Sequence, residues 1–286
     1  FPYSLNPPYV LKADGIAAGK GVLIFNSMDE AKTGLKNMIL KKKFGQASER
    51  VVIEEYLEGI EVSIFVLTDG DTYKVFPMAK DYKRIGVGDI GLNTGGMGAI
   101  SPVPFVDKKL YQKIENQIIR ATITGLKKDK IDYTGFLFIG LMIVKNEPYV
   151  IEYNVRLGDP ETEAILPRID SDLLEMFLQL KNSQLQNSNL KVRDLFSSTV
   201  MTVSKGYPEK YEKGKIITGL NCKNESFLFH CGTKKESQNI VTSGGRVIAV
   251  TSMDKFLNKA LEKTYTTISK IKFEGKTFRN DIGFDL

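Results

Sequence analysis

The segment YVIEYNVRLGDPETE carries side chains suited to hold a metal ion and phosphate groups. In an extended strand, alternate residues point to the same face, so Glu152, Asn154 and Arg156 are expected to form one row. A carboxylate, an amide oxygen and a guanidinium in one row suit magnesium bound to phosphates. Asp159 and Glu161 add two carboxylates in the proline turn that follows. A solvated strand face shows the same alternation, but the apolar run GFLFIGLMIV upstream and the two additional carboxylates favour a site.

The glycine-rich segment KADGIAAGKG suits the binding of phosphate groups. Glycine and alanine let backbone N–H groups approach phosphate oxygens closely, while Lys12 and Lys20 supply positive charge. The segment is not a Walker A loop, because too few residues separate Gly15 from Gly19 and no Ser or Thr follows Lys20. A surface hairpin with two solvated lysines is an equally good interpretation.

The segment VVIEEYLEGIEVS offers groups that can hold a nucleoside. The end of a predicted strand presents backbone groups to the edge of an adenine, and a glutamate beyond the glycine turn presents a carboxylate to ribose hydroxyls. These residues are Glu54, Glu55, Tyr56, Leu57 and Glu61. Taken alone, an ordinary edge strand with solvated glutamates explains this pattern better.

The segment DIGLNTGGMGAISP is predicted to form a mobile loop rich in hydrogen-bond donors. Its glycines surround Asn93 and Thr94, with Gly95 directly following them. Such a loop suits the capture of an anionic group. A purely structural Ω-loop is the alternative interpretation.

Hydrophobic periodicity predicts the elements that carry these segments. The helix over 28–43 begins with a capping box, in which Ser27 and Glu30 each satisfy a free backbone amide. The polar stretch SQLQNSNLKVR is the best candidate for a domain boundary. The predicted strands are Tyr9–Lys12, Val22–Phe25, 51–57, 61–67, Gly135–Val144, Tyr149–Glu152, Ser198–Ser204, 226–230 and 246–251, and the further helices lie around Leu110–Leu126, at 171–181 and around Leu257–Ile271.

Length and composition indicate a folded protein of roughly two domains, because a typical domain has about 150 residues. The chain has 286 residues, of which 42% are hydrophobic and 26% charged, values that exclude disordered, collagen-like and coiled-coil chains. The net charge of +6 is spread along the sequence, so no nucleic-acid partner is predicted. The densest basic run, Lys41–Lys43, is interpreted as a solvated helix end.

The expected location is the cytoplasm. Cys222 and Cys231 lack the spacing of a zinc site or a disulfide framework, so both are predicted to be free, buried thiols in a reducing compartment. The longest apolar stretch is about half of what a membrane helix needs, and the first residues do not resemble a signal peptide. His230 is the single histidine, so catalysis must rest on carboxylates, lysines, arginines, amides and backbone donors.

These segments occur together and in an order that resembles the ATP-grasp ligases. More specifically, the chain is similar to the glycinamide ribonucleotide synthetase family, the phosphoribosylamine–glycine ligases. The resemblance runs from about Pro8 to the carboxyl end, through KADGIAAGKGV, VIEEYLEG-E, NTGGMGA-SP, YTGFLF-GLM, IE-N-R-GDPET, GYP, GTK and VTSGGRV. Gly140 stands near a position where other ATP-grasp enzymes often carry a metal-binding glutamate.

The resemblance implies an α+β, ATP-grasp fold of two subdomains that clasp ATP, followed by a small α+β domain. The expected parts are a lid subdomain over 1–60, a core subdomain with the metal site over 61–192, and a C-terminal domain over 193–286. The implied reaction joins glycine to 5-phosphoribosylamine through glycyl phosphate and gives glycinamide ribonucleotide, ADP and phosphate in de novo purine synthesis. ATP is the implied co-substrate, and Mg²⁺ or Mn²⁺ the implied metal.

The resemblance also assigns roles to residues of the four segments. It implies Lys12 (also catalytic) and Lys20 for phosphates, Glu54, Glu55, Tyr56 and Leu57 for adenine, Glu61 for ribose, Glu152 and Asn154 for the metal, Arg156 for charge on the transferred phosphoryl group, and Asn93, Thr94, Gly95, Asp159 and Glu161 for the other substrates. The expected partners are these small molecules, without nucleic acid or membrane, and the expected state is a monomer or weak dimer.

The first eight residues, FPYSLNPP, do not match the family, whose members carry a preceding α/β domain. We therefore expect a fragment that binds magnesium-ATP but forms little or no product alone, because part of the phosphoribosylamine site is expected to be absent. Two other functions fit the sequence: another ATP-grasp carboxylate–amine ligase, and an ATP-binding fragment without turnover.

Overall fold

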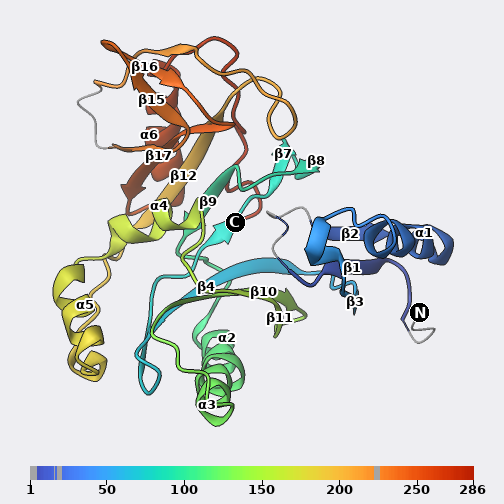
Figure 1. Ribbon diagram of the computed structural model, residues 1–286. Coiled ribbons are helices and arrows are strands. Elements are labelled where there is room, and N and C mark those ends of the chain that lie inside the picture. Colours follow the sequence, from blue (N-terminus) through green and yellow to red (C-terminus); the bar gives the residue numbers. More distant parts are fainter. Residues whose placement is uncertain (1–4, 16, 18–20, 222–225) are drawn as a thin grey trace. The chain divides into compact units, whose positions relative to one another are not determined.

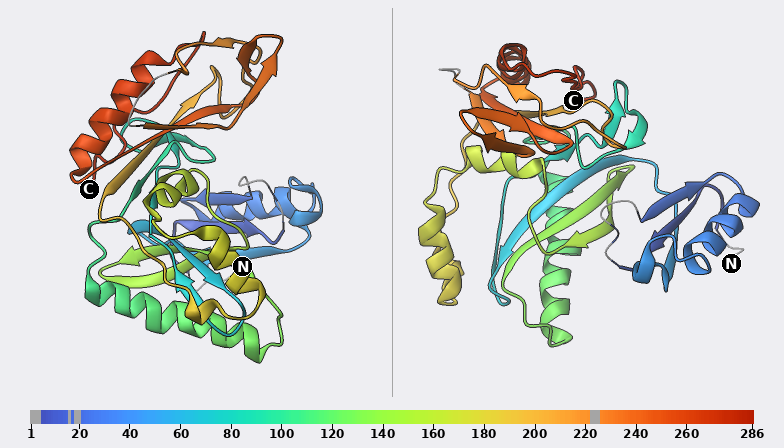
Figure 2. Two further views of the ribbon diagram at one scale, coloured as in Figure 1. Left: turned by 90° about the vertical axis from the view of Figure 1, so that its left-hand side faces the viewer. Right: turned by 45° about the horizontal axis from the view of Figure 1, so that its top comes forward.

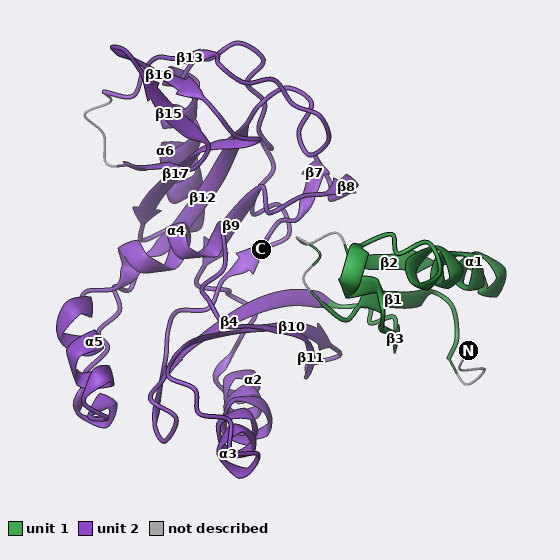
Figure 3. Ribbon diagram, viewed as in Figure 1, with its two compact units in different colours: residues 1–59 green, residues 60–286 purple. Residues whose placement is uncertain are grey.

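The computed structural model describes residues 5–15, 17, 21–221 and 226–286. They form two compact units, residues 1–59 and 60–286 (Figure 3). Both units combine helices with antiparallel strands, which confirms the α+β class. Lys20 and Cys222, both singled out in the sequence, lie outside the described residues.

Residues 1–59 form a three-stranded sheet covered on one face by a helix (Figure 1). The strand order is β2-β1-β3, with β1 at Tyr9–Ala13, β2 at Val22–Phe25 and β3 at Val51–Glu55. Helix α1 spans Met28–Ile39, and a 3₁₀ turn follows at Gly45–Ser48. Tyr9 and Leu11 on β1 and Ala31 and Met38 on α1 are buried, so this unit has a small core of its own.

The N-terminus of α1 is as predicted, but its C-terminus is not. The Ser27 side chain accepts a hydrogen bond from the Glu30 N–H at 3.3 Å. The helix ends at Ile39 rather than at residue 43, because Lys42 has the left-handed φ of 46° that stops an α-helix. Lys41–Lys43 are exposed beyond the helix end, in agreement with a solvated basic run.

The first sheet of residues 60–286 has the order β11-β10-β4-β5. These strands are β4 at Ile60–Thr68, β5 at Tyr73–Val75, β10 at Gly135–Val144 and β11 at Glu147–Asn154. Lys145 and Asn146, both with positive φ, form the two-residue turn of the predicted β10–β11 hairpin. This hairpin brings the apolar run and the polar row of the sequence into register.

A continuous helical stretch covers one face of this sheet (Figures 1 and 2). It comprises α2 at Lys108–Lys113, a π-helical segment at Ile114–Ile119 and α3 at Arg120–Lys128. Leu110, Ile114 and Ile118 are buried on it, which confirms the predicted amphipathic helix. Because the helix covers this face of the sheet, we expect the polar side chains of the strands to lie on the opposite face and at the strand ends.

The turn after β11 leads into short helices that belong to another buried cluster. These are α4 at Glu161–Ile165, a 3₁₀ turn at Leu166–Arg168, α5 at Leu173–Lys181 and a 3₁₀ turn at Leu185–Asn187. Phe65 and Phe138 from the sheet pack edge to face at 5.5 Å in this cluster, together with Ile165 of α4. The Asp172 carboxylate caps α5, which confirms the helix predicted at 171–181.

The second sheet combines strands that are far apart in the sequence. Its order is β14-β17-β12-β9-β6, with β6 at Lys80–Asp81, β9 at Gly98–Ser101, β12 at Phe196–Val203, β14 at Ser226–His230 and β17 at Arg246–Asp254. Ser198 of β12 lies opposite Ile100 of β9, so residues before 102 and after 195 share one sheet. The expected division into parts at residues 60 and 192 stays a prediction.

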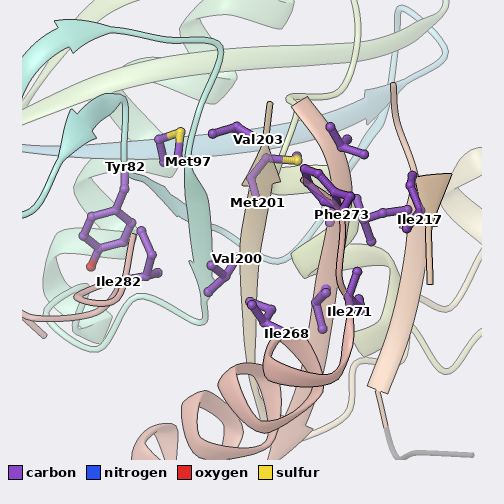
Figure 4. Packing of buried hydrophobic residues seen from close by; sticks show 14 of the residues in the cluster. Tyr82, Met97, Val200, Met201, Val203, Ile217, Ile268, Ile271, Phe273 and Ile282 are labelled. Carbon is purple, nitrogen blue, oxygen red and sulfur yellow. The ribbon is translucent and has the colours of Figure 1, made fainter. Parts of the chain in front are cut away.

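A helix and a smaller sheet complete the C-terminal part. Helix α6 spans Leu257–Lys270, and the small sheet contains β13 at Ile216–Ile217, β15 at Thr233–Glu236 and β16 at Asn239–Thr242. Figure 4 shows Met201, Ile268, Ile271 and Phe273 gathered in the core of this region. A short hairpin of β7, Arg84–Gly86, and β8, Ile90–Asn93, leads into the glycine loop.

Cys231 is a free thiol and is exposed, so the prediction of a buried thiol is wrong for this residue. It follows the last residue of β14, where the chain leaves the sheet. In the part of the chain that the structure describes, no helix is both long enough and apolar enough to cross a membrane.

Candidate active site

Glu152 and Asn154 share one face of β11, as the sequence predicts. The hairpin register sets Glu152 opposite Gly140 and Asn154 opposite Phe138, and the only irregularity recorded in this pairing precedes both. A Cβ atom at position 140 would lie 3.1 Å from Glu152 Cγ. The absence of a side chain at Gly140 therefore leaves room for the Glu152 side chain.

Arg156 does not continue the strand row. Strand β11 ends at Asn154, and the Arg156 guanidinium lies exposed in the following bend, where it donates to the Leu157 carbonyl at 2.8 Å. The expected row of three is thus a row of two followed by a guanidinium in the loop. Residues 155 and 156 lie beyond the last pair of the β10–β11 ladder, Phe138 and Asn154.

The Glu152 carboxylate and the Asn154 amide are the types of oxygen donor that suit a magnesium ion shared with phosphates. Among the described residues, no group of three or more His, Cys, Asp or Glu side chains is placed to hold a metal. Mg²⁺ usually keeps several waters and takes only one or two carboxylates, with substrate phosphates supplying other ligands. One carboxylate and one amide oxygen on the same strand face satisfy that requirement.

Glu161 and Asp159 are both engaged by other parts of the chain. Glu161 is buried, and its Oε1 accepts a hydrogen bond from the Ser63 hydroxyl at 2.8 Å. Burial raises the pKa of the Glu161 carboxyl, even though the Ser63 hydrogen bond acts in the opposite direction. Asp159 is half-exposed and forms an ion pair with Arg246 at 2.9 Å. Neither role was foreseen from the sequence.

Lys83, which the sequence analysis did not single out, lies close to several carboxylates of the site. Lys83 forms an ion pair with Glu61, the residue expected to bind ribose. Burial by itself lowers the pKa of the Lys83 ammonium, but the negative charges of Glu61 and Asp81 outweigh it, Glu152 adds to them, and the pKa is raised. The basic pair Lys83–Arg84 after β6 was the available signal, but local sequence did not reveal its acidic neighbours.

Asp81 is a second residue that the sequence analysis missed. Its Oδ1 is a buried polar atom without a hydrogen-bond partner among the described residues. Burial raises the pKa of Asp81 well above its usual range, and the nearby charge of Glu161 adds to the increase. The pKa values of Asp81 and Glu161 are therefore both raised, so each carboxyl is protonated more readily here than it would be in water.

Glu163 provides a test of this acidic cluster by pH. Burial and the charge of Asp159 raise its pKa to about 7, and its Oε2 lacks a hydrogen-bond partner in the described part of the chain. Because this pKa lies above the unfolded value of 4.5, the stability that protonated Glu163 contributes is complete below pH 4.5 and is lost as the pH rises through 7.

We expect Glu163→Gln to raise the free energy of unfolding at pH 8 by on the order of 1 kcal/mol, a value reduced for the screening of a half-buried group. The gain should be small at pH 5. Urea unfolding at both pH values measures the difference, with Glu175→Gln, an exposed glutamate on α5, as the control. An equal effect of Glu163→Gln at both pH values would contradict the assigned pKa.

The glycine loop uses its own backbone donors to hold its shape. The N–H and hydroxyl of Thr94 both donate to the Lys83 carbonyl at 2.8 Å. The Gly96 N–H donates to the Thr94 hydroxyl at 2.9 Å, and the Gly95 N–H donates to the Tyr207 hydroxyl at 2.9 Å. Asn93, at the end of β8, is exposed. These bonds are those of a structural loop, and the predicted capture of an anion rests mainly on Asn93.

In residues 1–59, the predicted phosphate-binding lysine lies on the sheet face that α1 does not cover. Lys12 lies opposite Val22 of β2 and Val52 of β3, both of which are exposed on the same face. The Lys12 Nζ lies 2.6 Å from Glu54 Oε2, and the lysine side chain is 17% exposed. Tyr56 is exposed directly after β3. This face of the unit therefore carries two exposed valines, a partly exposed glutamate and a lysine whose side chain is mostly buried.

Comparison with known proteins accounts for almost the whole chain. Residues 3–162 match the model of the phosphoribosylglycinamide synthetase ATP-grasp (A) domain, and residues 197–285 match that of the C domain of the same synthetase. The phosphoribosylamine–glycine ligase of Chlorobaculum tepidum is 44% identical over 279 residues, which are 96% of this chain and 66% of the relative. A bifunctional purine biosynthetic protein of Pichia angusta is 47% identical over 276 residues, which are 96% of this chain and 35% of the relative.

Solved structures show the same fold. The crystal structure of phosphoribosylamine–glycine ligase from Thermotoga maritima superposes with a TM-score of 0.90 at 37% identity, over 97% of this chain and 69% of that one. Biotin carboxylase from Campylobacter jejuni, at 15% identity, superposes with a TM-score of 0.70 over 96% of this chain and 59% of that one, and shares the fold alone. The chain spans about two thirds of the length of several of its curated relatives. These matches confirm the ATP-grasp fold.

Proposed function

Because this chain belongs to the phosphoribosylglycinamide synthetase family, we propose that it carries out the ATP-dependent ligation of glycine to 5-phosphoribosylamine. A carboxylate oxygen of glycine attacks the γ-phosphorus of ATP, and ADP leaves with the electron pair of the broken P–O bond. The sugar's amine nitrogen then attacks the carbonyl carbon of glycyl phosphate, phosphate leaves, and the nitrogen loses a proton. The products are glycinamide ribonucleotide, ADP and phosphate, as expected for a step of de novo purine synthesis.

The pair Glu152 and Asn154 is the observation that carries this proposal. Their shared face on β11, beside the space left by Gly140, supports a role as ligands of Mg²⁺ or Mn²⁺. When bound, the metal would neutralise charge on the phosphates of ATP. Arg156 follows in the bend, and its guanidinium stabilises negative charge on the transferred phosphoryl group.

Residues of the unit 1–59 are assigned to the phosphates and the adenine of ATP, and Glu61 is assigned to its ribose. Lys12 and Lys20 bind phosphates, and Lys12 exchanges its ion pair with Glu54 for a phosphate oxygen when ATP binds. The backbone of residues Glu54, Glu55, Tyr56 and Leu57 bonds the adenine edge. Glu61 accepts hydrogen bonds from ribose, since a carboxylate has room for both these hydroxyls and the Lys83 ammonium.

The other two substrates are assigned to the glycine loop and the turn after β11. Asn93, Thr94 and Gly95 contact an anionic group, with the exposed Asn93 amide as the main donor. Asp159 contributes negative charge that attracts an amine, and the buried Glu161 contributes a carboxyl oxygen that accepts a hydrogen bond from it. Their internal partners, Arg246 and Ser63, keep both carboxyls in fixed positions rather than free in solution. Catalysis then rests on positioning and charge neutralisation.

The test uses the full-length protein with ATP, glycine and phosphoribosylamine. We expect ADP release that depends on both glycine and the amine, with glycinamide ribonucleotide identified by mass spectrometry. ADP release with a different carboxylate or amine, and none with this pair, would replace the proposal by another ATP-grasp ligation. Nucleotide binding without ADP release under any of these conditions would show an ATP-binding protein without turnover.

We propose that the enzyme works in the cytoplasm and is a monomer or weak dimer. Its relatives are named as enzymes of purine biosynthesis, which supports this setting. Light scattering of the full-length protein at several concentrations measures the oligomeric state. A mass that stays at a tetramer or larger on dilution would contradict it.

A further inference from the structure

Arg246 connects the glycine loop to the turn after β11. It is the first residue of β17, and its side chain is 20% exposed. Its Nη1 donates to the Gly95 carbonyl at 2.5 Å and to the Asp159 carbonyl at 2.9 Å, while its Nη2 donates to Asp159 Oδ2 at 2.9 Å. One planar guanidinium thus binds three acceptors on two segments that lie more than sixty residues apart in the sequence.

Both backbone polar groups of Gly95 form hydrogen bonds with the C-terminal part of the chain. Its carbonyl accepts from Arg246, and its N–H donates to the Tyr207 hydroxyl at 2.9 Å. The Tyr207 ring packs against Gly245, where a Cβ atom would lie 2.2 Å from Tyr207 Cδ2. Gly245 directly precedes Arg246, so the two side chains that hold Gly95 approach it from neighbouring positions.

The loop and the turn also touch each other directly. Gly96 has a φ of +110°, and a Cβ atom there would lie 2.3 Å from Pro160 Cδ and 2.8 Å from Asp81 Oδ1. Only glycine allows this close approach together with this backbone conformation. The loop and the turn are therefore in direct contact at Gly96. Because the Arg246 guanidinium binds both segments, it fixes their position relative to each other.

We propose that Arg246 and Tyr207 are positioning residues that hold the Asn93–Gly96 loop and the Asp159 turn in the arrangement that binds the substrates other than ATP. This inference rests on the function proposed above, which assigns Asn93, Asp159 and Glu161 to those substrates. Neither Arg246 nor Tyr207 touches a reacting atom in this account. Their effect passes through Gly95 and Asp159, so it falls on the Michaelis constants of glycine and phosphoribosylamine and not on that of ATP.

The experiment compares Arg246→Ala, Arg246→Lys and Tyr207→Phe in the full-length protein. We expect Arg246→Ala to raise the KM of glycine, of phosphoribosylamine or of both by about tenfold, with the KM of ATP changed by less than twofold. A lysine keeps the charge but cannot bind all three acceptors, so Arg246→Lys should fall between the wild type and Arg246→Ala. Tyr207→Phe should raise the same constants by a factor of about three.

Two controls separate this effect from a loss of folding. Tyr211→Phe removes a hydroxyl from the ring adjacent to Tyr207, with centroids 6.2 Å apart, and Lys259→Ala removes an exposed charge from α6. Both should leave all three Michaelis constants within twofold of the wild type. If Arg246→Ala does not fold, Arg246→Lys and Tyr207→Phe carry the test.

Hydrogen exchange gives a readout that does not require activity. The amides of residues 94–97 should exchange at least tenfold faster in Arg246→Ala and Tyr207→Phe than in the wild type, because the bonds that hold Gly95 are lost. Unchanged exchange, unchanged constants for both substrates, or an equal rise for ATP would each overturn the proposal. A wild-type protein that forms no product would instead refute the proposed function, while hydrogen exchange would still show whether the two residues hold the loop.

Discussion

Glu152→Gln should lower the kcat of the full-length enzyme about 100-fold, and Asn154→Leu should have an effect of the same size. Glu152→Gln replaces a charged carboxylate by a neutral amide on the face of β11 that Gly140 leaves open, and Asn154→Leu removes an oxygen ligand from the same face. The metal is then misplaced relative to the charge that develops during phosphoryl transfer, and about 10²-fold is the usual cost of losing one preorganised stabilising group. Binding of ATP in the absence of metal should change little.

Steady-state kinetics at several magnesium concentrations, with ATP binding measured by titration calorimetry in the presence of a chelator, distinguish these effects. Glu147→Gln is a matched control, because it makes the same substitution at the other end of the same strand, where Glu147 pairs with Lys113. Its turnover should stay close to that of the wild type. Wild-type turnover in both Glu152→Gln and Asn154→Leu would remove the metal assignment from this strand.

Lys12→Ala should weaken ATP binding by roughly 1.5 to 3 kcal/mol, the usual range for a hydrogen bond to a charged group. Without nucleotide, the melting temperature should change little, because the Lys12–Glu54 pair is open to solvent on the side of Glu54, which is 38% exposed, and solvent-screened ion pairs contribute about 1 kcal/mol or less. The nucleotide effect is therefore larger than the structural effect. Titration calorimetry and thermal unfolding of the same variant measure the two quantities.

Glu54→Gln and Lys32→Ala are the controls for this prediction. Glu54→Gln removes the ion-pair partner but keeps the lysine, so it should leave ATP binding equal to or tighter than that of the wild type. Lys32→Ala removes an exposed lysine from α1 and should have no effect on affinity. An unchanged affinity in Lys12→Ala would show that Lys12 is a strand lysine without a role in nucleotide binding.

Several local features of this protein were predictable from residue order alone. The alternation at Glu152 and Asn154 sets both on one face because the strand is regular between them, and the Ser27 cap begins α1 because its partner is three residues away. The hairpin around Lys145 and Asn146 is local for the same reason. Errors arose at ends: α1 stops at Ile39 and β11 stops before Arg156, since element ends depend on individual backbone angles.

By itself, the sequence predicted the longer strands and helices and named the candidate ligands, because these depend on neighbours within a few residues. It missed short strands such as β6, β8, β9 and β16, and β8 and β9 lie within the segment that was predicted to be a loop. Only the tertiary structure decided which distant groups meet: Lys83 with Glu61, Asp81 with Glu161, and Arg246 with the Asp159 carboxylate and the Gly95 carbonyl. The last of these contacts depends on the pairing of β9 with β12 and on the packing of the glycine loop, which precedes β9, against the turn after β11. Periodicity reports only which face a side chain occupies, whereas a pKa depends on burial and on charges brought close by folding.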